Sequence, residues 1–414
     1  MRIRAAIMSL GVVAQALLCG CATGVKAPVA GGGAATADGL ILLDGTLLAE
    51  ARGRAEKGDA EMVAAVARLR ERAEGLLDAG PFTVTDKKTL PPSGDPHDYS
   101  SLAIYWWPNP DTPDGLPYVN RDGRRNPEAD QWDGKKLHDM TGAAHTLALA
   151  WYFTGNAAYA EKAGLLLRVW FLDPATRMNP NLNYAQGIPG KVHGTPTGII
   201  ESVGLATQVV DAACLLHGAP GWPKADAKGL EAWFREYLDW LENSGPGRME
   251  GLTRNNHAVW YEAQRAAFAL FAGEPEKARI SLAGPGREKI DRQIRADGSQ
   301  PEELRRTKSF DYSCYNLRAF FALAALGKKC GADLWGHRGP EGQSIPGALA
   351  FLTPHLDPAK EWTHEQIYPI HPAESLRPFL RQAAVQFGDA EFRKILGSLP
   401  PDEPGGQDAL LYPI

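Results

Sequence analysis

Helical periodicity runs through almost the whole of this 414-residue chain after residue 40, and it limits the possible folds more than any other feature. Apolar residues recur at the spacing of an α-helix, whereas runs of β-branched residues that alternate with polar ones are hard to find. The periodic segments are residues 46–78, 139–154, 157–171, 198–217, 226–243, 257–272, 286–296, 314–328, 346–354, 374–387 and 390–397. The sequence therefore predicts an all-α fold.

Three junctions between these segments share one pattern, namely Phe153-Thr154-Gly155-Asn156, Phe271-Ala272-Gly273-Glu274 and Phe387-Gly388-Asp389. In each, an aromatic residue closes one helix, glycine ends it and a polar residue starts the next, which is typical of αα-hairpins. Many such hairpins can stack as a solenoid or close into a ring, and no repeat period of about 20–50 residues indicates a solenoid. We therefore expect one domain over residues 40–414, an (α/α) toroid or incomplete barrel with long loops lining its cleft.

Charge and cysteine content exclude several classes of protein. The net charge of −5 and the sequence pI of about 6.1 provide no basic surface for nucleic acid. Cys214, Cys314 and Cys330 are scattered, so they form neither a disulfide framework nor a metal-binding pattern. His138 and His145 also lack the spacing of metal ligands. We expect no metal and no other cofactor.

The N-terminus has the pattern of a targeting segment. Arg2 and Arg4 precede an apolar stretch that ends in Leu18-Cys19-Gly20-Cys21, which resembles a bacterial lipobox. We expect residues 1–20 to be a lipoprotein signal peptide, Cys21 to be lipidated, and residues 21–39 to be a flexible tether. The alternative is an ordinary signal peptide cleaved at a small residue. Either reading places the protein in the periplasm or, with the anchor, on the outer membrane of a Gram-negative-type bacterium.

Two long stretches without helical periodicity, residues 81–138 and 173–197, interrupt the helices. Loops of this length in a compact domain are usually functional. The first stretch contains Trp106 and Trp107, whose indole rings suit stacking against the C–H face of a sugar. The alternative is that these two side chains plug the floor of the toroid.

Arg254-Asn255-Asn256-His257 joins a glycine-rich loop, residues 244–251, to an apolar helical segment. Free backbone N–H groups and the helix dipole make such a helix start suitable for a carboxylate or an oxyanion. The alternative is an asparagine cap followed by an exposed histidine. Arg306 and Tyr312 lie downstream, just before the helix expected near Cys314. We expect Asn256, His257, Arg306 and Tyr312 near helix N-termini of neighbouring hairpins, at one rim of the ring.

β-Elimination from a uronic acid requires a set of residues of this kind. Asn256, His257 and Arg306 would neutralise the C6 carboxylate, which makes the C5 proton more acidic. Tyr312 would take that proton and protonate the O4 leaving group, if both lie on one face of the sugar, as in D-mannuronate and D-glucuronate but not L-guluronate. We expect Arg306 to lower the pKa of Tyr312 and favour tyrosinate, and the helix start to keep His257 neutral.

Asn255-Asn256-His257, the run from Arg306 to Ser313 and the segment Asn179 to Gln186 resemble the bacterial alginate lyase superfamily over roughly residues 95–385. The loop around Trp106-Trp107-Pro108 resembles that of the branch acting on mannuronate-rich alginate or glucuronan. This resemblance implies a helical toroid and a polysaccharide lyase that leaves a 4,5-unsaturated uronate at the non-reducing end. It assigns Asn256 and His257 to carboxylate neutralisation, Arg306 to the assisting cation, and Tyr312 to general base and acid.

The resemblance also indicates residues that contact the substrate. Arg305 is the alternative to Arg306, since the spacing between arginine and tyrosine differs by one among relatives. His193 would contact a carboxylate or act as a second base, and Lys191 would attract an acidic polymer. Further candidates for substrate binding are Asn255, Trp106, Trp107, Tyr184 and Gln186. The alternative for His193, Tyr184 and Gln186 is that they brace the loop.

Two other functions compete with the lyase. A glycoside hydrolase on a helical toroid needs two opposed carboxylates, for which Glu201, Asp311 and Glu303 are the candidates. A non-catalytic, lipid-anchored glycan-binding protein needs exposed aromatic residues but no base. For all three functions the expected partner is an acidic polysaccharide or oligosaccharide, and the only expected membrane contact is the N-terminal anchor.

Overall fold

The computed structural model describes residues 39–400 and 406–414, which belong to one unit, Gly31–Ile414. The expected signal peptide, Cys21 and all but the last residue of the tether lie outside the described residues. The helices are α1 (Gly45–Glu56), α2 (Ala60–Leu76), α3 (Asp133–Thr154), α4 (Ala157–Phe171), α5 (Val210–Leu215), α6 (Lys224–Asn243), α7 (Gly245–Gly251), α8 (Asn256–Phe271), α9 (Pro275–Ser281), α10 (Arg287–Gln293), α11 (Pro301–Leu304), α12 (Ser309–Cys330), α13 (Ile345–Leu352), α14 (Pro372–Phe387), α15 (Ala390–Ser398) and α16 (Gln407–Leu411). The expected all-α fold is confirmed.

Short irregular helices and strands complete this part of the chain. The 3-10 helices are η2 (Pro127–Gln131), η3 (Pro196–Ser202) and η6 (Thr353–Leu356), and the π-helical turns are η4 (Leu205–Val209) and η5 (Leu282–Gly286). The strands are β1 (Ser100–Leu102), β2 (Trp106–Trp107), β3 (Val119–Asn120) and β4 (Tyr184–Gly187).

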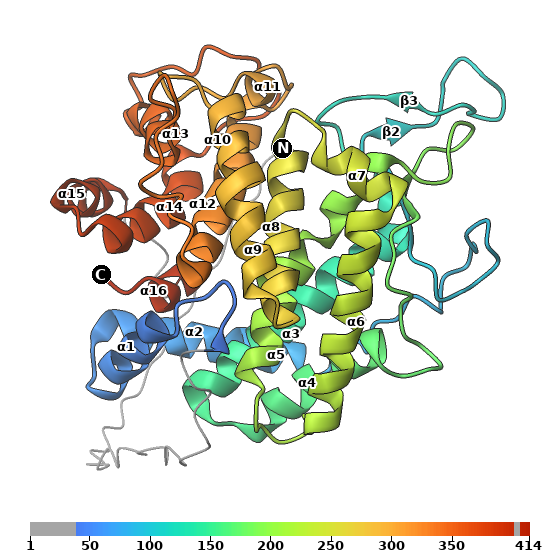
Figure 1. Cartoon of the computed structure of the whole chain (residues 1–414), viewed down its shortest axis with the longest axis horizontal. Coiled ribbons are helices and arrows are strands. Elements are labelled where there is room, and N and C mark those ends of the chain that lie inside the picture. The colour runs from blue at the N-terminus through green and yellow to red at the C-terminus, as the bar shows by residue number, and fades with distance from the viewer. Residues whose placement is uncertain (1–38, 401–405) are drawn as a thin grey trace, which may run out of the picture. The chain divides into compact units, whose positions relative to one another are not determined.

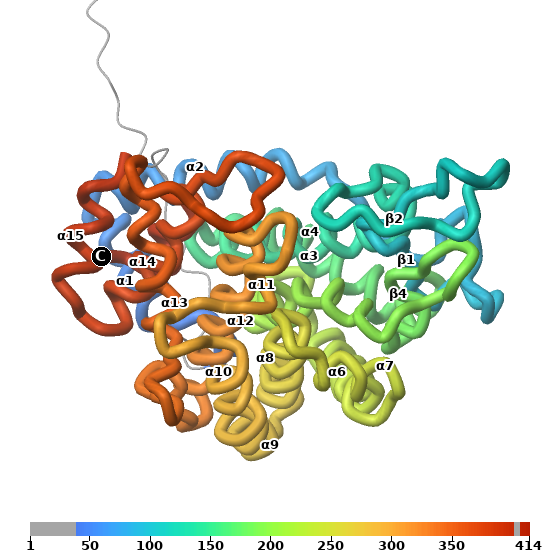
Figure 2. Tube along the Cα trace, turned by 90° about the horizontal axis from the view of Figure 1, so that it is seen from above, coloured from blue at the N-terminus to red at the C-terminus, as the bar shows by residue number. Residues whose placement is uncertain are grey.

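The helices form the expected (α/α) toroid. Helices α3, α8 and α12 are buried around most of their circumference, whereas the amphipathic helices α4 and α6 bury one face. Helix α3 packs on α5, α5 on α8, α8 on α12, α12 on α14, and α14 on α16. Helix α16 in turn packs against α1 and α2, and α2 against α3, so the two ends of the described chain meet (Figure 1). The view from above shows α8, α9 and α10 on the side away from α2 (Figure 2).

The predicted hairpin junctions are present. Gly155 ends α3 with φ 68°, a left-handed conformation that suits glycine, and the Asn156 side chain then accepts a hydrogen bond from the backbone N–H of Ala158. Gly388 and Asp389 repeat this arrangement between α14 and α15. These junctions place consecutive helices antiparallel and side by side.

Several predicted helix boundaries were wrong. The segment 46–78 is two helices, because Gly58 has φ 86° and Asp59 caps α2 through the N–H of Met62. The predicted helix 286–296 is preceded by α9 and runs on from it, since the π turn η5 accommodates Pro285 inside the helical path. The segment 244–251, expected to be a loop, is helix α7, with Ser244 as its N-cap.

The predicted helix 198–217 is instead a succession of 3-10, π and α turns, namely η3, η4 and α5. Its apolar stretch Pro196–Leu215, with a mean hydropathy of 1.4, is long enough to cross a membrane by composition alone. Because 61% of that stretch is buried inside the fold, it is better explained as part of the core.

The two long non-helical stretches meet through short strands. Strand β1 pairs in parallel with β4, and β2 pairs antiparallel with β3, with Trp106 opposite Asn120. The β2–β3 pair lies near α7 at the end of the helices (Figure 1), and β1 and β4 lie next to each other in the view from above (Figure 2). The strands therefore hold both loops over the N-terminal ends of α8 and α12, which form the site described next.

Candidate active site

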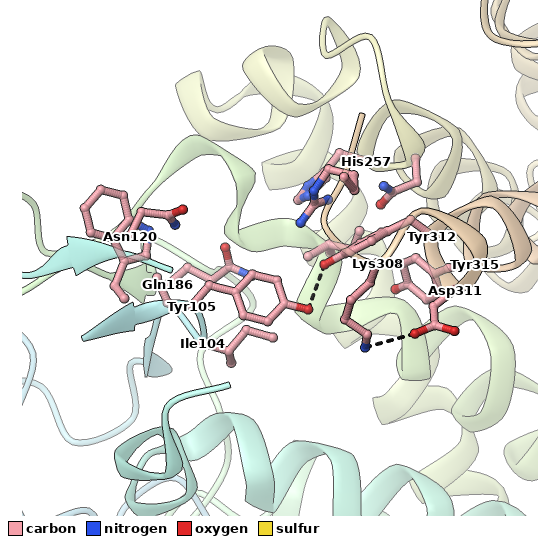
Figure 3. Close-up of a pocket in the computed structure, with 14 residues that line it drawn as sticks. Ile104, Tyr105, Asn120, Gln186, His257, Lys308, Asp311, Tyr312 and Tyr315 are labelled. Carbon is pink, nitrogen blue, oxygen red and sulfur yellow. Dashed lines mark hydrogen bonds and ion pairs between the residues drawn. The ribbon is translucent and has the colours of Figure 1, made fainter. Parts of the chain in front are cut away.

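A cavity of about 390 Å³ lies where α8 and α12 begin and where the β-strands meet the helices. Figure 3 shows its side chains converging from these elements. The lining residues are Ala103, Ile104, Tyr105, Trp106, Asn120, Gln186, Ile200, Asn256, His257, Arg306, Lys308, Asp311, Tyr312 and Tyr315. Asn256 and His257 at the start of α8 thus line the same cavity as Arg306 and Tyr312, which come from a separate segment of the sequence.

A buried glutamate orients Asn256 at the start of α8. The carboxylate of Glu303 on α11 accepts hydrogen bonds from the Asn256 backbone N–H at 2.7 Å and from its Nδ2 at 2.9 Å. Both side chains are 1% exposed. One hydrogen of Nδ2 is not used by Glu303, and Oδ1 is buried without a hydrogen-bond partner.

A second buried glutamate contacts His257. Nδ1 of His257 lies 3.0 Å from Oε1 of Glu250, which is on α7 and is 0% exposed. His257 therefore presents its other nitrogen, Nε2, to a ligand in the cavity.

Asp122 holds Arg306 in the turn between α11 and α12. The guanidinium donates from Nε at 3.1 Å and from Nη2 at 2.5 Å to the two carboxylate oxygens. Burial alone would lower the pKa of Arg306, but Asp122 and the neighbouring phenol raise it above its ordinary value, so this residue stays cationic. The Arg306 guanidinium carbon lies 3.6 Å from the centre of the Tyr312 ring, in cation–π contact.

The expectation that Tyr312 is a tyrosinate in the free protein was wrong. Burial raises its pKa and outweighs the lowering effect of Arg306, and the hydroxyl of Tyr105 raises the pKa further. Tyr312 is therefore a neutral phenol, and its hydroxyl donates to that of Tyr105 at 2.7 Å (Figure 3). A ligand that takes the proton of Tyr312 must replace this hydrogen bond.

Gln186 lies on the cavity wall with φ 51°, the one positive φ at a residue other than glycine in the described part of the chain. Its backbone N–H donates to Ser101 Oγ at 2.7 Å, and that hydroxyl donates to Glu201. Burial raises the pKa of Glu201 to about 7, against hydrogen bonds from Ser101 and Tyr99 that lower it. A strained backbone of this kind is common at ligand sites.

The two tryptophans have different surroundings. Trp106 lines the cavity, and Lys191 Nζ lies 4.4 Å from the centre of its ring. Trp107, next along β2, instead donates from Nε1 to the Arg124 carbonyl at 2.8 Å and does not line the cavity. Only Trp106 is thus placed to contact a ligand there.

The other predicted binding residues lie outside the cavity lining. His193 is exposed, Tyr184 is half-buried on β4, and Asn255 is at the N-cap position of α8 without a capping bond from its side chain. Arg305 is exposed and pairs with Glu302 at 2.7 Å. Of the two adjacent arginines, the structure places Arg306 in the cavity.

Comparison of the sequence with models of protein families assigns this chain to one family. A model of the alginate lyase family matches residues 83–362. The chain belongs to the alginate lyase family. It is therefore a polysaccharide lyase, and the cavity is the candidate active site of that lyase.

Solved structures agree with this assignment. An alginate lyase from Bacteroides ovatus is 34% identical, with a TM-score of 0.87, covering 90% of this chain and 98% of that one. Alginate lyase A1-III from Sphingomonas species A1 is 17% identical with a TM-score of 0.52, covering 84% and 95%, so this likeness concerns the fold alone. A variant of A1-III complexed with a tetrasaccharide has a TM-score of 0.58 at 18% identity, covering 92% and 97%. Comparison with curated proteins finds no match.

The three candidate carboxylates, Glu201, Asp311 and Glu303, are not placed as the opposed pair that a glycoside hydrolase needs. Asp311 is the one carboxylate among the described residues that line the cavity, and it pairs with Lys308 at 3.3 Å. Glu303 is bound to Asn256, and Glu201 is bound to Tyr99 and Ser101. Within residues 39–400 and 406–414, no group of three or more His, Cys, Asp or Glu side chains could hold a metal ion.

Sequence reasoning missed several residues of this lyase that contact the predicted ones. Tyr105 and Asp122 come from the non-helical stretch, whose course the sequence does not reveal. Glu250 had a usable signal, because Ser244 followed by Gly245-Pro246 is a recognisable helix start that places Glu250 on a helix. Lys308 and Tyr315 flank Tyr312 in the sequence and line the same cavity.

Proposed function

We propose that this lyase cleaves a polyuronate, either mannuronate-rich alginate or glucuronan, by β-elimination, leaving a 4,5-unsaturated uronate. The observation that carries the proposal is the cavity that unites Asn256, His257, Arg306 and Tyr312. The solved structures that it resembles are alginate lyases, and one of them is a complex with a tetrasaccharide. Lys191 adds positive charge beside the cavity for an acidic polymer, whereas the charge of Lys308 is paired with that of Asp311.

The first requirement is to hold the C6 carboxylate. Arg306 is cationic and kept in place by Asp122, so its remaining N–H groups supply a fixed positive charge. The free amide hydrogen of Asn256 supplies a neutral donor. Together they stabilise the enolate that forms as the C5 proton leaves, and the loss of one such donor typically raises the barrier by about 3 kcal/mol.

The second requirement is a proton acceptor at C5 and a donor at O4. The C5–H bond breaks, its electrons form the C4=C5 double bond, and the C4–O4 bond breaks as O4 receives a proton. Tyr312 performs both transfers if it first loses its own proton. In the other route His257 takes the C5 proton through Nε2, and Tyr312 gives its phenolic proton to O4. The raised pKa of Tyr312 favours the second route.

The direct test is a panel of polyuronates, comprising mannuronan, glucuronan, guluronan and pectate, incubated with the purified lyase. The product is followed by the ultraviolet absorbance of its conjugated double bond, while a reducing-end assay counts all cleavages. We expect absorbance and reducing ends to rise together on mannuronan or glucuronan. Reducing ends without absorbance would mean hydrolysis, and binding without either signal would mean a non-catalytic glycan-binding protein.

We also propose that Cys21 carries a lipid that anchors the lyase in the outer membrane, on the strength of the Leu18-Cys19-Gly20-Cys21 motif. Expression of the full chain and of Cys21→Ala in a Gram-negative host, followed by membrane fractionation, tests this proposal. We expect the full chain in the membrane fraction and Cys21→Ala in the soluble fraction. Equal distribution of the two proteins would contradict the anchor.

A further inference from the structure

Glu250 is a buried glutamate whose side chain has one hydrogen-bond partner in the described part of the chain, the imidazole of His257. Its side chain is 0% exposed, its Oε1 contacts His257 Nδ1, and its Oε2 has no hydrogen-bond partner. Burial of a carboxylate without full hydrogen bonding is costly. A buried acid with one contact to a cavity-lining imidazole therefore points to a role in the site rather than in stability.

Helix α7 fixes the position of this carboxylate. Ser244 caps the helix through the N–H of Gly247 at 3.0 Å. A Cβ at Gly247 would lie 1.8 Å from the Leu241 carbonyl oxygen, and one at Gly251 would lie 2.8 Å from the Tyr261 ring. The helix is thus packed closely between α6 and α8, and Glu250 has little freedom to move away from His257.

We propose that Glu250 is a positioning residue that fixes His257 as the tautomer with hydrogen on Nδ1 and a lone pair on Nε2. The carboxylate accepts the Nδ1 hydrogen, so the neutral ring offers the cavity an acceptor and no donor. The effect on turnover rests on the proposed function, whereas the tautomer itself does not.

In this geometry the first two residues of α8, Asn256 and His257, have different roles. A neutral His257 cannot donate a hydrogen bond from Nε2, so it does not neutralise a substrate carboxylate; Asn256 and Arg306 do so. His257 instead accepts the C5 proton on Nε2. The imidazolium that forms lies against the Glu250 carboxylate, which stabilises it, as a carboxylate does for histidine in other catalytic sites.

Nitrogen NMR of histidine-labelled protein at neutral pH reads the tautomer without any substrate. The His257 signals are assigned by their loss in His257→Gln. We expect the wild-type ring to show a protonated Nδ1 and an unprotonated Nε2. Protonation of Nε2 instead, or of both nitrogens, would overturn the inference whatever the activity.

Two variants connect the tautomer with turnover. Glu250→Met keeps the size of the side chain but removes the acceptor, so we expect the Nε2–H tautomer to dominate and kcat to fall about 100-fold with little change in KM. Glu250→Gln keeps an acceptor oxygen but loses the charge, so we expect the wild-type tautomer and about a 10-fold fall in kcat. An unchanged tautomer in folded Glu250→Met would also overturn the inference.

Glu262→Gln is the matched control, since Glu262 is a buried glutamate on α8, 3% exposed, that contacts Arg265 and Ser281 instead. We expect it to leave both the His257 signals and kcat unchanged; equal changes in this control would contradict a specific role for Glu250. If His257→Gln keeps full activity while the wild-type tautomer is as expected, then the proposed role of His257 in catalysis is wrong and the tautomer assignment stands.

Discussion

Two arginines that are neighbours in the chain have different surroundings in the fold. Arg306 lines the cavity, donates from two nitrogens to Asp122 and stacks on Tyr312. Arg305 points away and makes a surface ion pair with Glu302, of a kind that contributes little. Sequence spacing left both as candidates, because the turn between α11 and α12 decides which side chain faces inward.

We predict that Arg306→Ala lowers kcat about 100- to 1,000-fold, because it removes a fixed cation from the carboxylate site. The neighbouring Arg305→Ala is the matched control and should change kcat by less than about twofold, as expected of an exposed residue. Both are measured by product absorbance on the preferred polyuronate. A larger loss in Arg305→Ala than in Arg306→Ala would exchange their roles.

At the same scale, the sequence indicated which residues gather but not their protonation. Asn256, His257, Arg306 and Tyr312 were named from motifs and spacing, and all four line one cavity. The ionisation of Tyr312 was predicted wrongly, since its pKa depends on burial and on the hydroxyl of Tyr105, which is distant in sequence. Proximity of opposite charge is readable from a motif, whereas desolvation requires the whole fold.

At the scale of elements, the long helices were predictable and the turns between them less so. Helices such as α4, α6 and α14 carry one apolar face and clear caps. Helix α7 was missed because three glycines in seven residues weaken its helical signal. The π turn η5 was missed because a proline normally ends a helix, and here an insertion in the hydrogen-bond ladder accommodates Pro285.

Helix α3 carries a histidine whose burial makes the fold sensitive to acid. Burial lowers the pKa of His145 to about 4, so the folded protein binds fewer protons than the unfolded chain between pH 4 and 6.5. The contribution of His145 to the free energy of unfolding is therefore unaffected by acid above pH 6.5. Below that pH the unfolded chain takes up a proton that the folded protein does not, so the free energy of unfolding falls. Between pH 7.5 and 5, wild type should lose about 2 kcal/mol more unfolding free energy than His145→Gln.

Urea unfolding of both proteins at the two pH values measures this difference. His138, also on α3, has more solvent around it, so His138→Gln serves as the control and should follow the wild-type pH dependence. Parallel pH curves for wild type and His145→Gln would contradict the assignment of acid sensitivity to His145.

At the scale of the whole described domain, the ring is held together by contacts between distant parts of the chain. Asp211 on α5 accepts hydrogen bonds from the backbone N–H groups of Ile41, Leu42 and Leu43 at 2.6, 3.0 and 2.8 Å. Helix α16 packs against α1 and α2 nearby in the ring. The number of hairpins predicted a toroid. Nothing in the sequence marked Asp211 as the residue that binds the N-terminal segment, because Asp211 and Ile41 are 170 residues apart in the chain.

We predict that Asp211→Asn lowers the free energy of unfolding by about 3 kcal/mol. The asparagine NH₂ would face backbone N–H groups, which leaves buried donors without an acceptor. Asp130→Asn, at an exposed ion pair with Arg125, is the control and should cost less than about 1 kcal/mol. Urea unfolding measures both, and equal effects would mean that Asp211 does not fasten the segment.

We propose that the cavity at the start of α8 and α12 performs β-elimination with Tyr312 in proton transfer. The most direct measurement is the rate of double-bond formation by wild type, Tyr312→Phe and the control Tyr118→Phe, whose hydroxyl instead contacts Glu128. We expect Tyr312→Phe to bind polyuronate but to lose about 1,000-fold in kcat, with Tyr118→Phe close to wild type. Wild-type turnover in Tyr312→Phe would contradict the account.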